Sequence, residues 1–74
     1  MRKILTDKQE EVFNIVKEFI EKNGYSPSIR ELCVLTNKKS TSTIAEYLMV
    51  LSDKGYITYQ VGKNRTIRII DEVK

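Results

Sequence analysis

The sequence has no histidine, no tryptophan and only one cysteine, and these absences exclude whole classes of protein. One thiol cannot form an intramolecular disulfide, and without histidine a structural zinc site has too few ligands. The 74 residues are also too few for a second core, because domains usually have roughly 100–200 residues. We therefore expect one domain over residues 1–74, stabilised by packing alone and without a metal or another cofactor.

Long hydrophobic runs are also missing. The apolar runs are far shorter than the roughly 20 residues that cross a bilayer, and residues 1–7 lack the hydrophobic centre of a secretion signal. Without histidine or clustered carboxylates, the sequence offers no general acid or base. We therefore expect a cytoplasmic protein that is neither membrane-inserted nor an enzyme, and we see no pattern for a small-molecule ligand.

The charged residues are unevenly distributed along the chain. Residues 1–23 hold five basic and five acidic residues, whereas residues 24–70 hold seven basic and three acidic ones, a net charge of +4. The last four residues contribute −1, which gives the total of +3. A neutral first part followed by a basic part favours an anionic partner such as nucleic acid, although an ordinary solvated surface explains this charge equally well.

A first helix is predicted over about residues 7–22. Thr6 and Gln9 fit a capping box, and apolar residues follow at helical spacing. Asn23-Gly24 ends the helix, because glycine adopts the left-handed conformation of a helix C-cap without a steric penalty. The residues of the apolar face are Val12, Phe13, Val16, Phe19 and Ile20.

Two further helices are predicted close together. Ser28 and Glu31 form a second capping box, which starts a helix over about 28–36 that ends near Asn37. Ser40 opens a third helix over about 41–54, with Ile44, Leu48 and Leu51 on its apolar face. Because only about three residues separate these two helices, the pattern predicts a helix-turn-helix.

After Gly55 the hydrophobic period changes from 3.6 to 2, which predicts a hairpin over about 57–70. Ile57, Tyr59 and Val61 alternate with polar residues, and so do Ile67 and Ile69. Residues 62–65 form a turn with two positive charges between the two runs. The expected fold is mainly α with a small β-hairpin, a three-helix winged helix-turn-helix.

The start of the third helix suggests a surface for nucleic acid. Four successive hydroxyl residues occupy 40–43, and capping explains one or two of them. Small polar side chains at a helix start permit close approach to base edges and phosphates, and a helix of about 20 Å fits the major groove of about 12 Å width. Glu46 either accepts a hydrogen bond from a cytosine amino group or is simply solvated.

Basic residues flank this helix and complete the predicted DNA-binding surface. Lysines in the turn, at the helix end and at the hairpin tip are expected to reach phosphates, and Arg65 is a candidate for the minor groove. The full set of candidate DNA-binding residues is Ser28, Lys38, Lys39, Ser40, Thr41, Ser42, Thr43, Glu46, Tyr47, Lys54, Lys63, Asn64 and Arg65.

Three segments resemble a known family. They read Leu-Thr-Asp-Lys-Gln-Glu-Glu-Val at 5–12, Gly-Tyr-Ser-Pro-Ser-Ile-Arg-Glu-Leu at 24–32 and Leu-Ser-Asp-Lys-Gly-Tyr-Ile at 51–57. This pattern, over residues 3–70, resembles the N-terminal DNA-binding domain of LexA repressors. The run at 40–44 is similar to the serine-rich recognition helix of Gram-positive members.

The resemblance implies operator binding and transcriptional repression. Its base-reading positions correspond to Ser40, Ser42, Thr43 and Glu46, and the hairpin turn at 63–65 would lie on the DNA backbone. Ala45 and Glu46 stand where Gram-positive members have histidine and glycine, so the resemblance does not carry over an operator sequence. The self-cleaving peptidase domain of LexA repressors has no counterpart in these 74 residues, so the resemblance implies no peptidase activity.

Three apolar residues fall outside the predicted core faces. Val34 lies about 140° from Ile29 on the helical wheel, and Leu35 and Met49 are also off the core stripes. Single exposed apolar residues are common, but these three form our hypothesis for a homodimer contact.

Two other functions stay open at this point. One is a winged-helix adaptor for protein interaction, with the same three apolar residues as its docking surface. The other is the detached DNA-binding head of a longer, self-cleaving SOS repressor.

Overall fold

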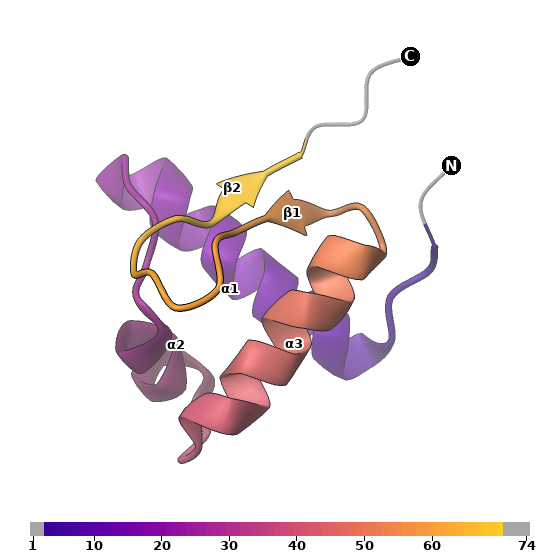
Figure 1. Ribbon diagram of the computed structural model, residues 1–74, viewed down its shortest axis with the longest axis horizontal. Coiled ribbons are helices and arrows are strands. Elements are labelled where there is room, and N and C mark those ends of the chain that lie inside the picture. Colours follow the sequence, from indigo (N-terminus) through magenta and orange to yellow (C-terminus); the bar gives the residue numbers. More distant parts are fainter. Residues whose placement is uncertain (1–2, 71–74) are drawn as a thin grey trace.

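The computed structural model describes residues 3–70, which form three helices followed by a two-stranded antiparallel sheet (Figure 1). The fold class predicted from the sequence is therefore confirmed. The elements are α1 (Asp7–Asn23), α2 (Ile29–Thr36), α3 (Thr41–Asp53), β1 (Ile57–Thr58) and β2 (Arg68–Ile69).

Reciprocal capping boxes start the first two helices. The Thr6 hydroxyl accepts the Gln9 N–H at 3.2 Å, and the Gln9 side chain accepts the Thr6 N–H at 3.1 Å. Ser28 and Glu31 exchange the equivalent bonds at 3.1 and 2.9 Å. Each box satisfies two backbone groups that a helix start otherwise leaves unpaired.

Left-handed residues end these two helices. Gly24 follows α1 with φ 81°, and Asn37 follows α2 with φ 59°. Asparagine is among the few residues other than glycine that enter this region readily, and its N–H here caps the carbonyls of Cys33 and Val34. The chain therefore turns sharply after α2 and enters α3 within four residues, as a helix-turn-helix requires.

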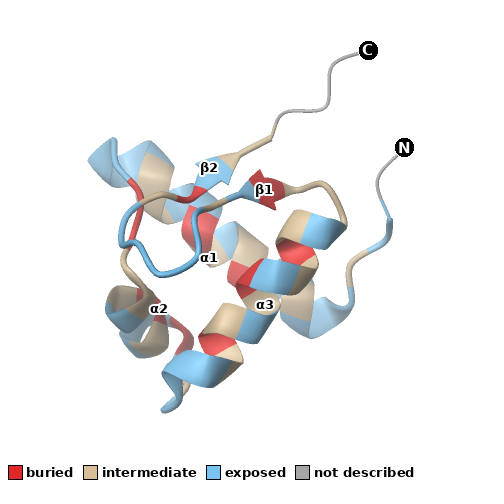
Figure 2. Ribbon diagram, in the orientation of Figure 1, coloured by how far each residue is buried: buried red, intermediate tan, exposed pale blue. Residues whose placement is uncertain are grey.

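The core lies where the three helices and the hairpin meet (Figure 2). Leu32 contributes from α2, and the buried face of α3 packs against it and α1. The buried apolar residues are Val12, Val16, Leu32, Ile44, Leu48, Leu51, Ile57 and Ile67.

The strands are shorter than the sequence alternation predicted. The pairs are Ile57 with Ile69 and Thr58 with Arg68. Continued in the same register, the ladder would pair Gln60 with Thr66, but there the Thr66 hydroxyl accepts the Gln60 N–H at 2.9 Å and bonds the Gln60 carbonyl at 3.4 Å. A side chain thus takes the place of strand pairing, and the inclusion of Val61 in the strand was wrong, because it lies in the turn with 84% exposure.

The three apolar residues outside the core stripes are exposed, as predicted. The exposed fractions are 80% for Val34, 48% for Leu35 and 51% for Met49. Leu35 lines a groove with Ile15 and Phe19 of α1, while Met49 lies on α3. In the described part of the chain, no helix has both the length and the apolar content needed to cross a membrane.

Candidate nucleic-acid interface

The first turns of α3 present polar side chains to solvent. Thr41, Ser42 and Glu46 are exposed, and Thr43 is partly exposed. Ser40 is the N-cap, and its hydroxyl accepts the Thr43 N–H at 3.4 Å. The helix buries its opposite face through the core residues of α3, so its polar face points outward by helical periodicity.

The turn before α3 adds positive charge next to these hydroxyls. Lys39 is exposed, whereas Lys38 is partly buried, with its Nζ 5.5 Å from the centre of the Tyr47 ring. A cation over an aromatic face is attracted by the ring quadrupole. Lys38 and Lys39 therefore stand directly before the hydroxyl-rich start of α3, with Lys39 exposed and Lys38 against Tyr47.

The hairpin tip lies on the same side of the molecule as α3. Figure 1 shows α3 and the loop between β1 and β2 in front, with α1 behind them. Lys63 and Asn64 are exposed at this tip. The hairpin tip and the start of α3 therefore lie on the same side of α1 in this view, although about 20 residues of sequence separate them.

Arg65 differs from its neighbours at the tip, because its guanidinium group turns back onto the protein. Nη1 lies 2.9 Å from Glu31 Oε1 and donates to the Ser26 carbonyl at 3.1 Å, and Nη2 donates to Glu31 Oε2 at 3.1 Å. The guanidinium also lies over the Tyr25 ring, 5.0 Å from its centre. These contacts attach the hairpin to the loop before α2 and to the first turn of α2.

Two other candidate residues have intramolecular partners. The Lys54 ammonium donates to the Ile4 carbonyl at 3.0 Å and to Gln9 Oε1 at 2.7 Å. Lys54 therefore ties the end of α3 to the start of α1, away from the hydroxyl-rich start of α3. Ser28 is the partly buried N-cap of α2.

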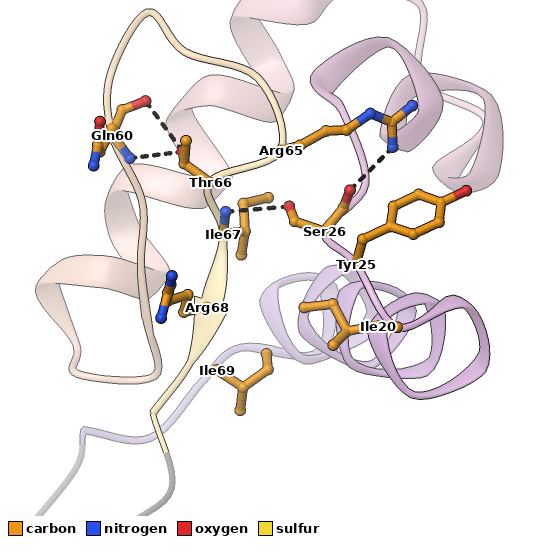
Figure 3. A pocket seen from close by; sticks show the side chains of 10 residues that line it. Ile20, Tyr25, Ser26, Gln60, Arg65, Thr66, Ile67, Arg68 and Ile69 are labelled. Atoms are coloured by element: carbon orange, nitrogen blue, oxygen red, sulfur yellow. Dashed lines mark hydrogen bonds between the residues drawn. The ribbon is translucent and has the colours of Figure 1, made fainter.

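Ser26 and Glu31 were missed as residues that hold the hairpin in place. Ser26 is 7% exposed, and its hydroxyl accepts the Ile67 N–H of the hairpin at 3.1 Å while donating to the Pro27 carbonyl at 2.9 Å (Figure 3). Their partners on the hairpin are 34 to 41 residues away, so no local pattern could have found them.

Glu31 is held in its ionised form by its surroundings. The hydrogen bond from the Ser28 backbone N–H, and then the bond from Arg65, lower the pKa of the Glu31 carboxyl below its usual value of 4.5. Both donors favour the carboxylate over the neutral acid. Among residues 3–70, no group of three or more histidine, cysteine or acidic side chains is arranged to hold a metal ion.

Comparison with known sequences shows the family of the chain. A family model described as the LexA DNA binding domain matches residues 1–66. The chain belongs to the LexA DNA-binding domain family. The predicted resemblance to LexA is therefore confirmed.

Individual LexA repressors match nearly the whole chain. That of Caldicellulosiruptor saccharolyticus is 46% identical over 72 residues, which cover 97% of this chain and 36% of the relative. That of Acetivibrio thermocellus is 39% identical over 74 residues, which cover 100% and 35%. That of Alkaliphilus oremlandii is 46% identical over 66 residues, which cover 89% and 32%. The chain thus spans about a third of the length of the curated relatives it matches.

Proposed function

We propose that this chain binds double-stranded DNA in a sequence-specific manner and acts as a transcriptional repressor. The observation that carries the proposal is the exposed hydroxyl-rich start of α3 lying on the same side as the basic turn and the hairpin tip. Membership of the LexA DNA-binding domain family supports DNA as the ligand. The relatives are named LexA repressors, which supports repression as the outcome of binding.

The proposed binding mode places α3 in the major groove. Ser40, Ser42 and Thr43 approach base edges or phosphates, and Glu46 accepts a hydrogen bond from a cytosine amino group. Thr41 and Tyr47 border the same helix face. Hydroxyl groups both donate and accept hydrogen bonds, so they can pair with donors or acceptors on base edges. A carboxylate such as that of Glu46 only accepts.

Lysines on both sides of α3 are proposed to bind the DNA backbone. Lys38 and Lys39 lie on one side, and Lys63 with Asn64 lies at the hairpin tip. Ser28 is proposed to meet the backbone at the start of α2, in the manner of the first helix of a helix-turn-helix. Lys54 and Arg65 are weaker candidates, because their charged groups already bond other parts of the protein.

Selection of bound sequences from a pool of random duplexes tests the proposal. The 74-residue chain is expected to enrich a defined motif, and the affinity for that motif should exceed the affinity for a shuffled duplex by about 10³-fold or more. Enrichment of no motif, with equal affinity for both duplexes, would contradict sequence-specific binding.

The homodimer contact through Val34, Leu35 and Met49 stays a prediction. Val34 has the largest exposed fraction of the three, 80%, which makes it the best site for a disruptive change. Sedimentation equilibrium should detect a dimer that the substitution Val34→Asp removes. A monomer at high micromolar concentration would rule the contact out.

A further inference from the structure

The hairpin is held to the rest of the protein by a small group of polar residues, which we call the hairpin anchor: Ser26, Glu31 and Arg65. Arg65 binds both oxygens of Glu31 and the Ser26 carbonyl, and the Ser26 hydroxyl binds the Ile67 N–H. Figure 3 shows Arg65 reaching from the hairpin to Ser26 and the Tyr25 ring. The anchor therefore contacts the hairpin on both sides of Thr66.

Core packing of Ile57 and Ile67 holds the base of the hairpin, whereas the tip at 62–65 is exposed. The two strands are two residues long, and a two-stranded hairpin is marginally stable by itself in water. A pocket of about 530 Å³ lies between the hairpin, the loop before α2 and α1, with Ile20, Tyr25 and Ile69 in its lining (Figure 3). The polar contacts of the anchor cross this hollow and join the tip side of the hairpin to the loop before α2 and to α2.

The arginine itself is committed to these contacts. A guanidinium group binds a carboxylate best as a planar fork, and Arg65 meets Glu31 in this two-pronged way. Arg65 also has φ 57°, a left-handed conformation that is uncommon for residues other than glycine, asparagine and aspartate. The two-pronged bond engages the guanidinium with a carboxylate of the protein itself at the surface, where the Arg65 side chain is 44% exposed.

We infer that Arg65 is a positioning residue, and that the hairpin anchor sets where Lys63 and Asn64 stand relative to α3. The inference rests on the proposed DNA-binding function and assigns Arg65 and Glu31 a role within it. Arg65 acts on DNA through the hairpin it holds. Glu31 then strengthens DNA binding, because it holds Arg65 and with it the hairpin. A carboxylate near DNA would otherwise oppose binding by repelling the phosphates.

Whether a Glu31 variant binds DNA more weakly or more tightly distinguishes a positioning role of Arg65 from a direct phosphate contact. The variant Glu31→Gln keeps an acceptor for the Ser28 N–H, because glutamine also serves in a capping box, so α2 is retained. If Arg65 only positions the hairpin, Glu31→Gln should weaken binding to the selected duplex by about three- to tenfold. If Arg65 contacts phosphate, the same variant removes a repulsive charge and frees the guanidinium, so binding should stay equal or become tighter.

A double-mutant cycle with Arg65→Ala completes the test. Positioning predicts that the double variant loses no more affinity than Arg65→Ala alone, because removing Arg65 already breaks its contact with Glu31. It also predicts that Glu31→Gln and Arg65→Ala shift the salt dependence in the same direction, since both displace Lys63 from its proposed phosphate contact. Additive losses, with a shallower salt slope in Arg65→Ala but not in Glu31→Gln, would overturn the inference and assign Arg65 to the phosphates.

A measurement made without DNA tests the hairpin anchor independently of the proposed DNA-binding function. Amide exchange at Ile67 should accelerate in Glu31→Gln and Arg65→Ala relative to α1 amides, and unchanged exchange in both would overturn the anchor. The control Thr6→Ala loses a helix cap on α1 and should alter neither Ile67 exchange nor affinity in the folded chain. If the DNA-binding function fails, the wild-type chain enriches no duplex while Ile67 exchange still accelerates in the variants.

Discussion

The start of α3 and the hairpin tip lie on one side of the molecule but are built in different ways. The side chains of α3 are placed by the helix itself, with a local bond between Ser40 and Thr43 and a buried face beneath. The hairpin is placed by bonds from Arg65 and Ile67 to residues 34 to 41 positions earlier. Similar polar residues on one surface therefore divide into those that are free to meet the proposed DNA and those that bond other parts of the protein.

The basic residues of this surface are likewise not equivalent as candidates for phosphate contacts. Lys39 and Lys63 are exposed and suit phosphate contacts. Arg65 and Lys54 have comparable charge but bond carbonyl or side-chain oxygens within the chain. Net charge alone therefore overstates the number of groups that can neutralise phosphates.

A cavity in the core that α3 and the hairpin share should have the largest effect, because it destabilises both regions of the fold. Leu48 is 1% exposed on α3, so Leu48→Ala should lower the free energy of unfolding by about 2–5 kcal/mol. The neighbouring change Met49→Ala removes a 51% exposed side chain and should stay within about 0.5 kcal/mol. Urea unfolding measures both, and equal stabilities of the two variants would contradict the assigned core.

A charge at the start of α3 should damage binding without damaging the fold. Ser42→Asp removes a proposed base contact, worth about 1–3 kcal/mol, and adds phosphate repulsion, so affinity should fall at least about tenfold. Stability should hold or rise by a few tenths of a kcal/mol, because an acidic group near a helix N-terminus is favourable.

The matched control for that change lies on α1. Asn14→Asp adds the same charge at an exposed position of α1, the helix that lies behind α3 in Figure 1. Fluorescence anisotropy measures the affinity of both variants for the selected duplex. Equal affinities would show that the start of α3 does not contact the DNA.

Lysine at the hairpin tip should have a smaller effect, visible in the salt dependence. Lys63→Ala removes one proposed phosphate contact, so the slope of log affinity against log salt should become shallower by about 0.9. Lys17→Ala removes the same charge from an exposed position on α1 and should leave the slope unchanged. Equal salt slopes in the two variants would show that Lys63 makes no phosphate contact. DNA binding would then be assigned to α3 and the turn before it.

Acid should loosen the hairpin before it affects α3. The pKa of Glu31 is lowered in the folded chain by the Ser28 N–H and Arg65, so these bonds stabilise the fold above the usual value of 4.5. That stabilisation is lost as the pH falls below 4.5 and through the folded pKa. The carboxyl carbon shift of Glu31, followed by NMR, should titrate below 4.5 and move upward in Arg65→Ala. A midpoint at or above the usual value would contradict the bonds described here.

Features that depend on neighbouring residues were predictable from the sequence. The capping boxes Thr6–Gln9 and Ser28–Glu31 span three residues, and Gly24 and Asn37 act through their own backbone conformations. The apolar face of α3 follows from its period. Such local rules also predicted the exposed hydroxyls at the start of α3, because residues opposite a buried stripe face solvent.

The hairpin shows where local rules stop. Alternation at Tyr59 and Val61 favoured longer strands, but the Thr66 hydroxyl takes the place of backbone pairing with Gln60. A tip arginine is typical of a nucleic-acid contact, yet Arg65 binds Glu31 and Ser26. Neither result follows from the residue types, because each depends on which group lies nearby once the chain has folded.

The amino-acid order was sufficient for three capped helices, their buried faces and a basic hairpin, since each depends on interactions within one turn or on a repeating period. The tertiary structure alone decided which charged residues remain exposed to a partner and which bind the protein. An ion pair forms only between groups brought within a few ångströms, and folding brings Arg65 to Glu31 across 34 residues of sequence.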